Sequence, residues 1–191
     1  MASFIITNGT DSPPIIGANL VPGPIKEGDS LRCELAGLYG IVHMIEHISC
    51  HYKISKGSVH VACNNEQALK VFHPNFLPDP QQANFDFQNA LFALLKESPI
   101  SWLCEHVKGH QDTKQRHRPL TCLESLIVCM DKLAQKVWSH YALHPHALSH
   151  APCSIDGEGW QLWNGDQKVS SPSDSTVYSI LQYSSTQTWW I

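Results

Sequence analysis

The chain has 191 residues, of which 42% are hydrophobic and 16% charged, and its formal net charge is −4. This composition is ordinary for a globular protein with one sizeable core. It excludes a protein that coats nucleic acid through bulk electrostatics, because affinity for phosphates comes from Lys and Arg that displace counterions. The sequence contains no apolar run of about eighteen residues, the length needed to span a membrane, and no signal peptide is evident. We expect an intracellular protein with reduced cysteines.

The N-terminal part of the chain predicts a strand pair followed by a helix. Residues 3–7 and 15–20 are short apolar runs, and the loop between them is rich in Asn, Gly, Asp and Pro. Such a loop favours an antiparallel pair. Ser30 stands where an N-cap is expected, ahead of apolar positions spaced by three or four: Leu31, Leu35, Leu38, Val42, Ile45 and Ile48. That spacing predicts a helix of roughly 18 residues with one apolar face.

The middle of the chain alternates strands with helices. Strands are predicted over 58–63 and 100–107, and helices over 66–72, 85–97 and 121–141. A proline-rich break separates the first two of these helices, and a basic loop precedes the third. Together with the first strand pair, this order is typical of an α/β fold with a mixed sheet and flanking helices.

The last fifty residues show a weaker pattern. We predict one domain over 1–141, a Pro- and His-rich linker over 142–157, and an extension over 158–191. Within the extension, Asn164-Gly165 lies between two short runs and favours a β-hairpin. Residues 174–184 indicate a weak helix or coil.

Three separated motifs carry most of the chemical information. Arg32-Cys33-Glu34-Leu35-Ala36-Gly37 opens the first helix, Val107-Lys108-Gly109-His110 leaves a strand, and Asp131-Lys132-Leu133-Ala134 lies on the last helix. In this order and spacing they resemble the type 1 ribonuclease H domain of retroelement reverse transcriptases, over roughly residues 2–141. The resemblance implies a ribonuclease H-like fold and a hydrolase that cleaves the RNA strand of an RNA–DNA hybrid as an endonuclease.

The resemblance also assigns roles to individual residues. Such cleavage is in-line phosphoryl transfer, in which two Mg²⁺ ions about 3.5–4 Å apart stabilise the attacking and leaving oxygens. By resemblance, Glu34 and Asp131 are metal ligands, His110 assists proton handling or product release, and Asn64 occupies the position of another carboxylate. The partner implied is an RNA–DNA hybrid or other nucleic acid, contacted by four basic residues of the loop region: Lys108, Lys114, Arg116 and Arg118. No small-molecule cofactor and no membrane are expected.

Two departures from the family argue against full activity. Asn64 offers one neutral carbonyl oxygen where a carboxylate offers two charged ones, so it cannot bridge two divalent cations comparably. The family strand that bears the first Asp is central in its sheet and precedes the strand predicted here over 3–7, and this sequence has no room for it. Its loss leaves backbone groups at the sheet centre unpaired. We therefore expect an N-terminally truncated domain with impaired hydrolysis.

Three functions stay open at this point. The first is a hybrid-directed endonuclease or its remnant. The second is a non-catalytic module that recognises hybrid backbone and 2′-hydroxyls by shape. The third is a structural remnant without hydrolase activity. Taken singly, Glu34 and Asp131 could also be ordinary helix residues at the edge of solvent. The basic loop could likewise be an ordinary solvated loop.

Histidine and cysteine residues suggest two further chemistries. His43 and His47 are four residues apart on the first helix, and His144, His146, His150 and Cys153 have ligand-like spacing. Met44 follows His43 where a zinc protease needs Glu, and the second set lies in a Pro-rich stretch, so neither predicts a zinc site. A Cys–His nucleophile pair is disfavoured because Cys63 and Cys104 lie at apolar strand ends.

Overall fold

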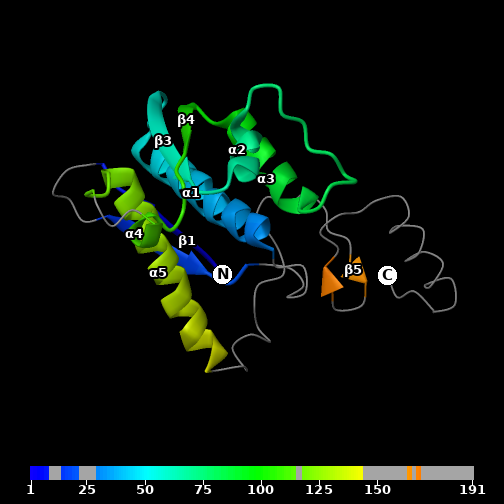
Figure 1. The fold of residues 1–191 in the computed structure, drawn as a ribbon. Coiled ribbons are helices and arrows are strands. Elements are labelled where there is room, and N and C mark those ends of the chain that lie inside the picture. Colours follow the sequence, from blue (N-terminus) through cyan, green and yellow to red (C-terminus); the bar gives the residue numbers. More distant parts are fainter. Residues whose placement is uncertain (9–13, 22–28, 115–117, 144–162, 165–166, 169–191) are drawn as a thin grey trace, which may run out of the picture.

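The computed structural model describes residues 1–8, 14–21, 29–114, 118–143, 163–164 and 167–168, and its strands form separate pairs (Figure 1). β1 (Ala2–Ile6) is antiparallel to β2 (Ile15–Asn19), in a register that joins Ala2 to Asn19. β3 (Gly57–Cys63) is parallel to β4 (Ile100–His106), in a register that joins Gly57 to Ile100. The chain is thus mixed α/β as predicted, but the described strands do not join into one mixed sheet.

The first helix, α1 (Ser30–Tyr52), is 23 residues long. The expected N-cap was wrong by one position: the side chain of Asp29 accepts a hydrogen bond from the Arg32 N–H at 2.6 Å, and Ser30 is already helical. At the other end Lys53 adopts a left-handed conformation with φ of 56°, and its N–H donates to the Cys50 carbonyl. The helix exceeds the predicted length because its last, polar turn stays helical up to this cap.

The remaining helices follow the predicted order. The predicted helix over 66–72 divides into α2 (Glu66–Leu69) and a 3₁₀ turn, η2 (Lys70–Phe72), followed by α3 (Phe85–Glu97). A short helix that the sequence did not indicate, α4 (Gln111–Lys114), precedes α5 (Cys122–Ala142). In the described part of the chain, no helix is long and apolar enough to cross a membrane.

The C-terminal predictions are only partly covered by the structure. β5 (Trp163–Asn164) pairs antiparallel with β6 (Gln167–Lys168), as expected for the two sides of the predicted hairpin. Residue 142 of the predicted linker is still helical. The rest of that linker and the predicted helix or coil over 174–184 lie outside the described residues.

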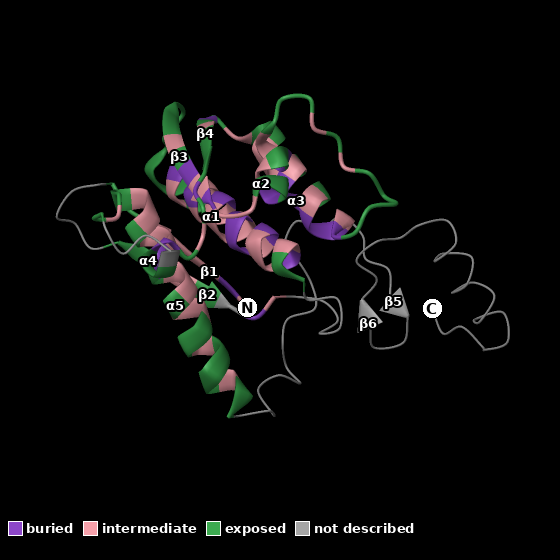
Figure 2. Cartoon of the chain, in the orientation of Figure 1, coloured by how far each residue is buried: buried purple, intermediate pink, exposed green. Residues whose placement is uncertain are grey.

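The buried core lies on one side of the molecule, between α1, β3 and the α2 to α3 segment (Figure 2). Its cluster consists of Leu35, Leu38, Val42, Val61, Cys63, Ala68, Val71, Phe87, Ala90 and Leu91. By contrast, Val128 is the only residue of α5 that is buried. The apolar face of α5, although present in the sequence, is therefore only partly covered by the described residues.

β1 lies between α1 and α5. The Ser3 Oγ donates a hydrogen bond to the Met130 carbonyl of α5 at 3.0 Å. On the α1 side, the ring of Phe4 covers Gly40 so closely that a Cβ there would stand 2.8 Å from it. Because successive strand residues face opposite sides, adjacent Ser3 and Phe4 reach the two helices in turn.

Candidate functional site

The predicted site residues come from four segments that meet at the carboxyl ends of β3 and β4. Parallel strands end at the same edge, so Asn64 after β3 lies beside the turn that follows β4. The His106 Nε2 is 3.2 Å from the Asn64 carbonyl oxygen, and a Cβ on Gly109 would stand 3.1 Å from the Asn64 Nδ2. Glycine at 109 therefore lets the turn approach Asn64.

Glu34 enters the same region from α1 and is half-buried. The Cys63 thiol donates a hydrogen bond to the Glu34 Oε2 at 3.4 Å. Burial raises the pKa of Glu34, the thiol hydrogen bond lowers it, and the negative charge of Asp131 raises it further. Burial, with the Glu34 charge, in turn raises the pKa of the Cys63 thiol to about 12. This thiol is thus a neutral donor to the carboxylate.

Asp131 enters from the middle of α5, opposite the turn that carries His110. The His110 Nδ1 is 3.9 Å from the Asp131 Oδ2, with the two side chains 67% and 31% exposed. Burial raises the pKa of Asp131, while the neighbouring His110 lowers it and Asp112 raises it. His110 itself has a φ of 57°, which turns the chain away from β4. The structure therefore brings Glu34, Asp131 and His110 together, with Asn64 beside them.

These residues do not fit a pair of magnesium ions. The carboxylates are Glu34 and Asp131, with Asp112 near Asp131 but paired with Lys132, and the neighbouring groups are the neutral Asn64 amide and the neutral Cys63 thiol. Among the described residues, no three His, Cys, Asp or Glu side chains are arranged to hold a metal ion. Magnesium requires several oxygen ligands in near-octahedral geometry. The described residues therefore offer fewer charged oxygen ligands than a two-metal mechanism requires.

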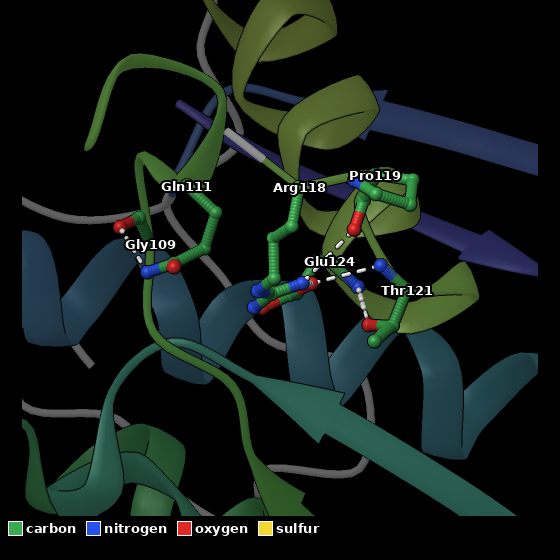
Figure 3. A network of polar contacts seen from close by, with 6 residues as sticks. All are labelled: Gly109, Gln111, Arg118, Pro119, Thr121 and Glu124. Carbon is green, nitrogen blue, oxygen red and sulfur yellow. Dashed lines mark hydrogen bonds and ion pairs between the residues drawn. The ribbon is translucent and has the colours of Figure 1, made fainter. Parts of the chain in front are cut away.

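The structure describes the side chains of two of the four residues predicted to contact phosphates, Lys108 and Arg118. Lys108 is exposed at the start of the turn. Arg118 instead forms a bidentate ion pair with Glu124, at 2.8 and 2.5 Å, and also donates to the Pro119 carbonyl (Figure 3). The Lys114 side chain and all of Arg116 lie outside the described residues.

The ion pair of Arg118 belongs to the start of α5. Thr121 is the N-cap: its hydroxyl accepts from the Glu124 N–H at 3.2 Å, and the Glu124 carboxylate accepts from the Thr121 N–H at 2.8 Å. Hydrogen bonds from Arg118 and Thr121 lower the pKa of Glu124 to about 2. Arg118 therefore stabilises a helix end, a role that the basic composition of the loop did not indicate.

Sequence reasoning also missed the role of Arg32. Its guanidinium is 1% exposed and makes two hydrogen bonds of 2.8 and 2.7 Å to Asp86 of α3. It also donates to the Asn84 Oδ1 at 3.2 Å and lies 4.7 Å from the centre of the Phe87 ring. An arginine beside the apolar positions of a helix was the available signal, since a buried guanidinium requires a carboxylate partner.

Among the described residues, the histidine pair on α1 does not belong to a group of three or more potential metal ligands. The rings of His43 and His47 are 4.5 Å apart between centroids, in an edge-to-face arrangement. The second set, from His144 to Cys153, lies outside the described residues.

No protein-family model, no curated protein and no solved structure matches this chain.

Proposed function

We propose that the chain is a ribonuclease H-like nucleic-acid-binding domain of retroelement origin, with impaired or lost hydrolysis. Its ligand is an RNA–DNA hybrid, held by its backbone at the carboxyl ends of β3 and β4. The proposal combines the motif resemblance of the sequence with the meeting of those motifs in space.

The observation that carries the proposal is the convergence of Glu34, Asp131 and His110. These residues are far apart in the sequence and come from α1, α5 and the turn after β4. Unrelated surface residues have no reason to meet, whereas two carboxylates with raised pKa values beside a histidine are typical of a functional site. The exposed Lys108 at the same turn supports a ligand with phosphates.

The donor set supports impaired rather than full catalysis. A two-metal mechanism needs carboxylates that bridge both cations, and the site offers two carboxylates, an amide and a thiol. No step through magnesium follows from these residues. The two carboxylates can repel the negative charge of a phosphate. His110 and Lys108 lie at the rim of the site, where they can contact a polyanion.

Binding to a labelled RNA–DNA hybrid across a salt series tests the proposed ligand. We expect weak, salt-sensitive binding. The logarithm of the association constant should fall linearly with the logarithm of the salt concentration, with a slope of roughly −0.9 for each phosphate contacted, as for B-DNA. Lys108→Gln should weaken binding and lower that slope. Lys96→Gln is the matched control, because Lys96 is exposed at the end of α3, just before the opposite end of β4. Equal binding by all three chains would overturn the interface, and no binding at low salt would favour a structural remnant.

A cleavage assay in Mg²⁺ tests the impairment separately. We expect hydrolysis of the hybrid to be several orders of magnitude below that of an intact two-metal enzyme, because the metals supply much of the transition-state stabilisation. Asn64→Asp alone should restore little. Robust magnesium-dependent cleavage by the unmodified chain, lost in Asp131→Asn, would contradict the impairment while supporting the site.

A further inference from the structure

A pair of histidines lies on α1 away from the candidate site. His43 is half-buried and His47, one turn further along, is exposed. Their rings are 4.5 Å apart between centroids, in an edge-to-face arrangement. From Glu34 to His43 the helix makes about two and a half turns, so the pair lies on the face opposite Glu34. The proposed nucleic-acid function therefore does not use these histidines.

Aromatic contacts restrict the position of the His43 ring. Tyr39, one turn earlier on α1, stacks on this ring with centroids 5.5 Å apart and an interplanar angle of 29°. Tyr39 in turn meets the buried ring of Phe87 edge-to-face, at 6.1 Å between centroids. The His43 ring thus lies between Tyr39 on one side along the helix and His47 on the other. A ring that is already held in place loses less conformational entropy when it binds a ligand.

A buried carboxylate oxygen lies close to the pair along the helix. Glu46 is three residues after His43, and residues three apart are neighbours on a helix surface. The Glu46 Oε1 is buried and has no hydrogen-bond partner among the described residues. A carboxylate oxygen in such a position is costly, and a nearby cation reduces the cost. Because no three potential ligands of the described residues are arranged around one ion, Glu46 contributes its charge and not a direct bond.

We propose that His43 and His47 bind one Zn²⁺ ion through one ring nitrogen each, with water in the remaining positions. Imidazole is a preferred zinc ligand, at Zn–N distances of about 2.0–2.1 Å, whereas magnesium requires oxygen ligands. Two histidines four residues apart present their rings on one helix face, which is how helices hold zinc. Each ring has to turn a nitrogen toward the ion, and the broad χ2 wells of histidine allow that turn. The proposal does not rest on the proposed nucleic-acid function.

NMR of the histidine ring nitrogens during a Zn²⁺ titration tests the pair. The chain has 12 histidines, so total zinc uptake does not identify the site, whereas individual ring signals do. We expect the signals of His43 and His47 to shift together and to give one common dissociation constant. The titration is run above neutral pH, because zinc binds the neutral imidazole. Mg²⁺ at the same concentrations should leave both signals unchanged.

Two alanine variants separate the pair from a neighbouring histidine. His47→Ala should weaken zinc binding at His43 at least about tenfold, the loss that even indirect partners of a metal ligand cause. His51→Ala is the matched control, because it removes an exposed histidine one turn further along α1 and keeps the pair. The His51 ring contacts Tyr52, at 4.7 Å between centroids. Zinc binding at His43 should therefore be unchanged in His51→Ala.

Three results would overturn the zinc site. The first is a His43 ring signal that does not move at millimolar Zn²⁺. The second is equal zinc binding at His43 in His47→Ala and in the unmodified chain, which would mean that each histidine binds alone. The third is a loss in His51→Ala as large as that in His47→Ala. Hybrid binding is measured separately, so the zinc site and the proposed function can each fail without the other.

Discussion

At the scale of single residues, the candidate site places two carboxylates in partly buried positions. Glu34 is half-buried, hydrogen-bonded to a neutral thiol and close to a second carboxylate, so its charged form is disfavoured. The neighbouring His110 lowers the pKa of Asp131, whereas Asp112 raises it. An ion pair between Asp112 and Lys132, at 3.6 Å, holds α4 to α5 beside this group. Raised pKa values of this kind are typical of ionisable groups at functional sites.

Replacing Glu34 by Gln should stabilise the fold at neutral pH. Because the folded pKa of Glu34 is raised above 4.5, the folded chain holds a proton that the unfolded chain releases between pH 4.5 and that raised value. Stability from this group therefore falls as pH rises through that window, and Glu34→Gln should remove the fall. Urea denaturation at a series of pH values measures it. Glu97→Gln, at the exposed end of α3, is the control that should keep the fall, and identical profiles for all three chains would contradict the prediction.

At the scale of elements, one polar contact joins two helices and another defines where a helix begins. The Arg32–Asp86 pair fixes the start of α1 to the start of α3, and both side chains are at most 2% exposed. The capping box of Thr121 and Glu124, with Arg118 on its outside, defines where α5 begins after the loop. The first contact joins residues far apart in the sequence, whereas the second is a local capping box that the Thr-x-x-Glu pattern indicates.

Breaking the buried pair should destabilise the protein strongly. Arg32→Met leaves the Asp86 carboxylate buried without its cation, and removal of one partner of such a pair costs about 3–5 kcal/mol. The double variant Arg32→Met/Asp86→Leu should recover much of that loss, because an apolar pair needs no compensation for burial. Free energies of unfolding in urea test this. A double variant as unstable as the single one would show that the contact with Phe87, not the charge, dominates.

The helix cap of α5 gives a smaller and separate effect. Thr121→Ala removes the hydroxyl that accepts from the Glu124 N–H and should cost about 1 kcal/mol. The lowered pKa of Glu124, about 2, means that its contribution is present above pH 4.5 and lost as pH falls toward 2. Thr121→Ser, which retains the hydroxyl, is the control for thermal melts. A cost for Ser equal to that for Ala would contradict the capping role.

At the scale of the whole molecule, the core and the β1–β2 pair are held differently. The buried cluster joins α1, β3, α2, η2 and α3, and contains no residue of β1 or β2. Ile15 and Ile16 of β2 are 41% and 53% exposed. Within the described residues, the first strand pair contacts mainly α1 and α5, and no ladder joins it to the second pair.

Native-state hydrogen exchange should therefore detect two levels of stability. We expect amides of β1 and β2 to exchange through a local opening well before those of β3, α1 and α3, because fewer buried apolar contacts hold them. Mass spectrometry of peptic fragments over a denaturant series measures this. A single common protection level for both strand pairs would show one cooperative unit and contradict the prediction.

Local pattern in the sequence determined most elements, because apolar spacing and turn residues act over a few positions. The spacing of Leu35, Leu38 and Val42 predicted α1, and alternation before Asn64 predicted β3. The motifs also selected Glu34, His110 and Asp131 before their proximity was known. Only the tertiary structure decided what lies across long separations: the thiol of Cys63 at Glu34 and the carboxylate of Asp86 at Arg32. Pairing of strands was likewise decided in three dimensions, since the described strands form separate pairs and not the one mixed sheet that the sequence predicts.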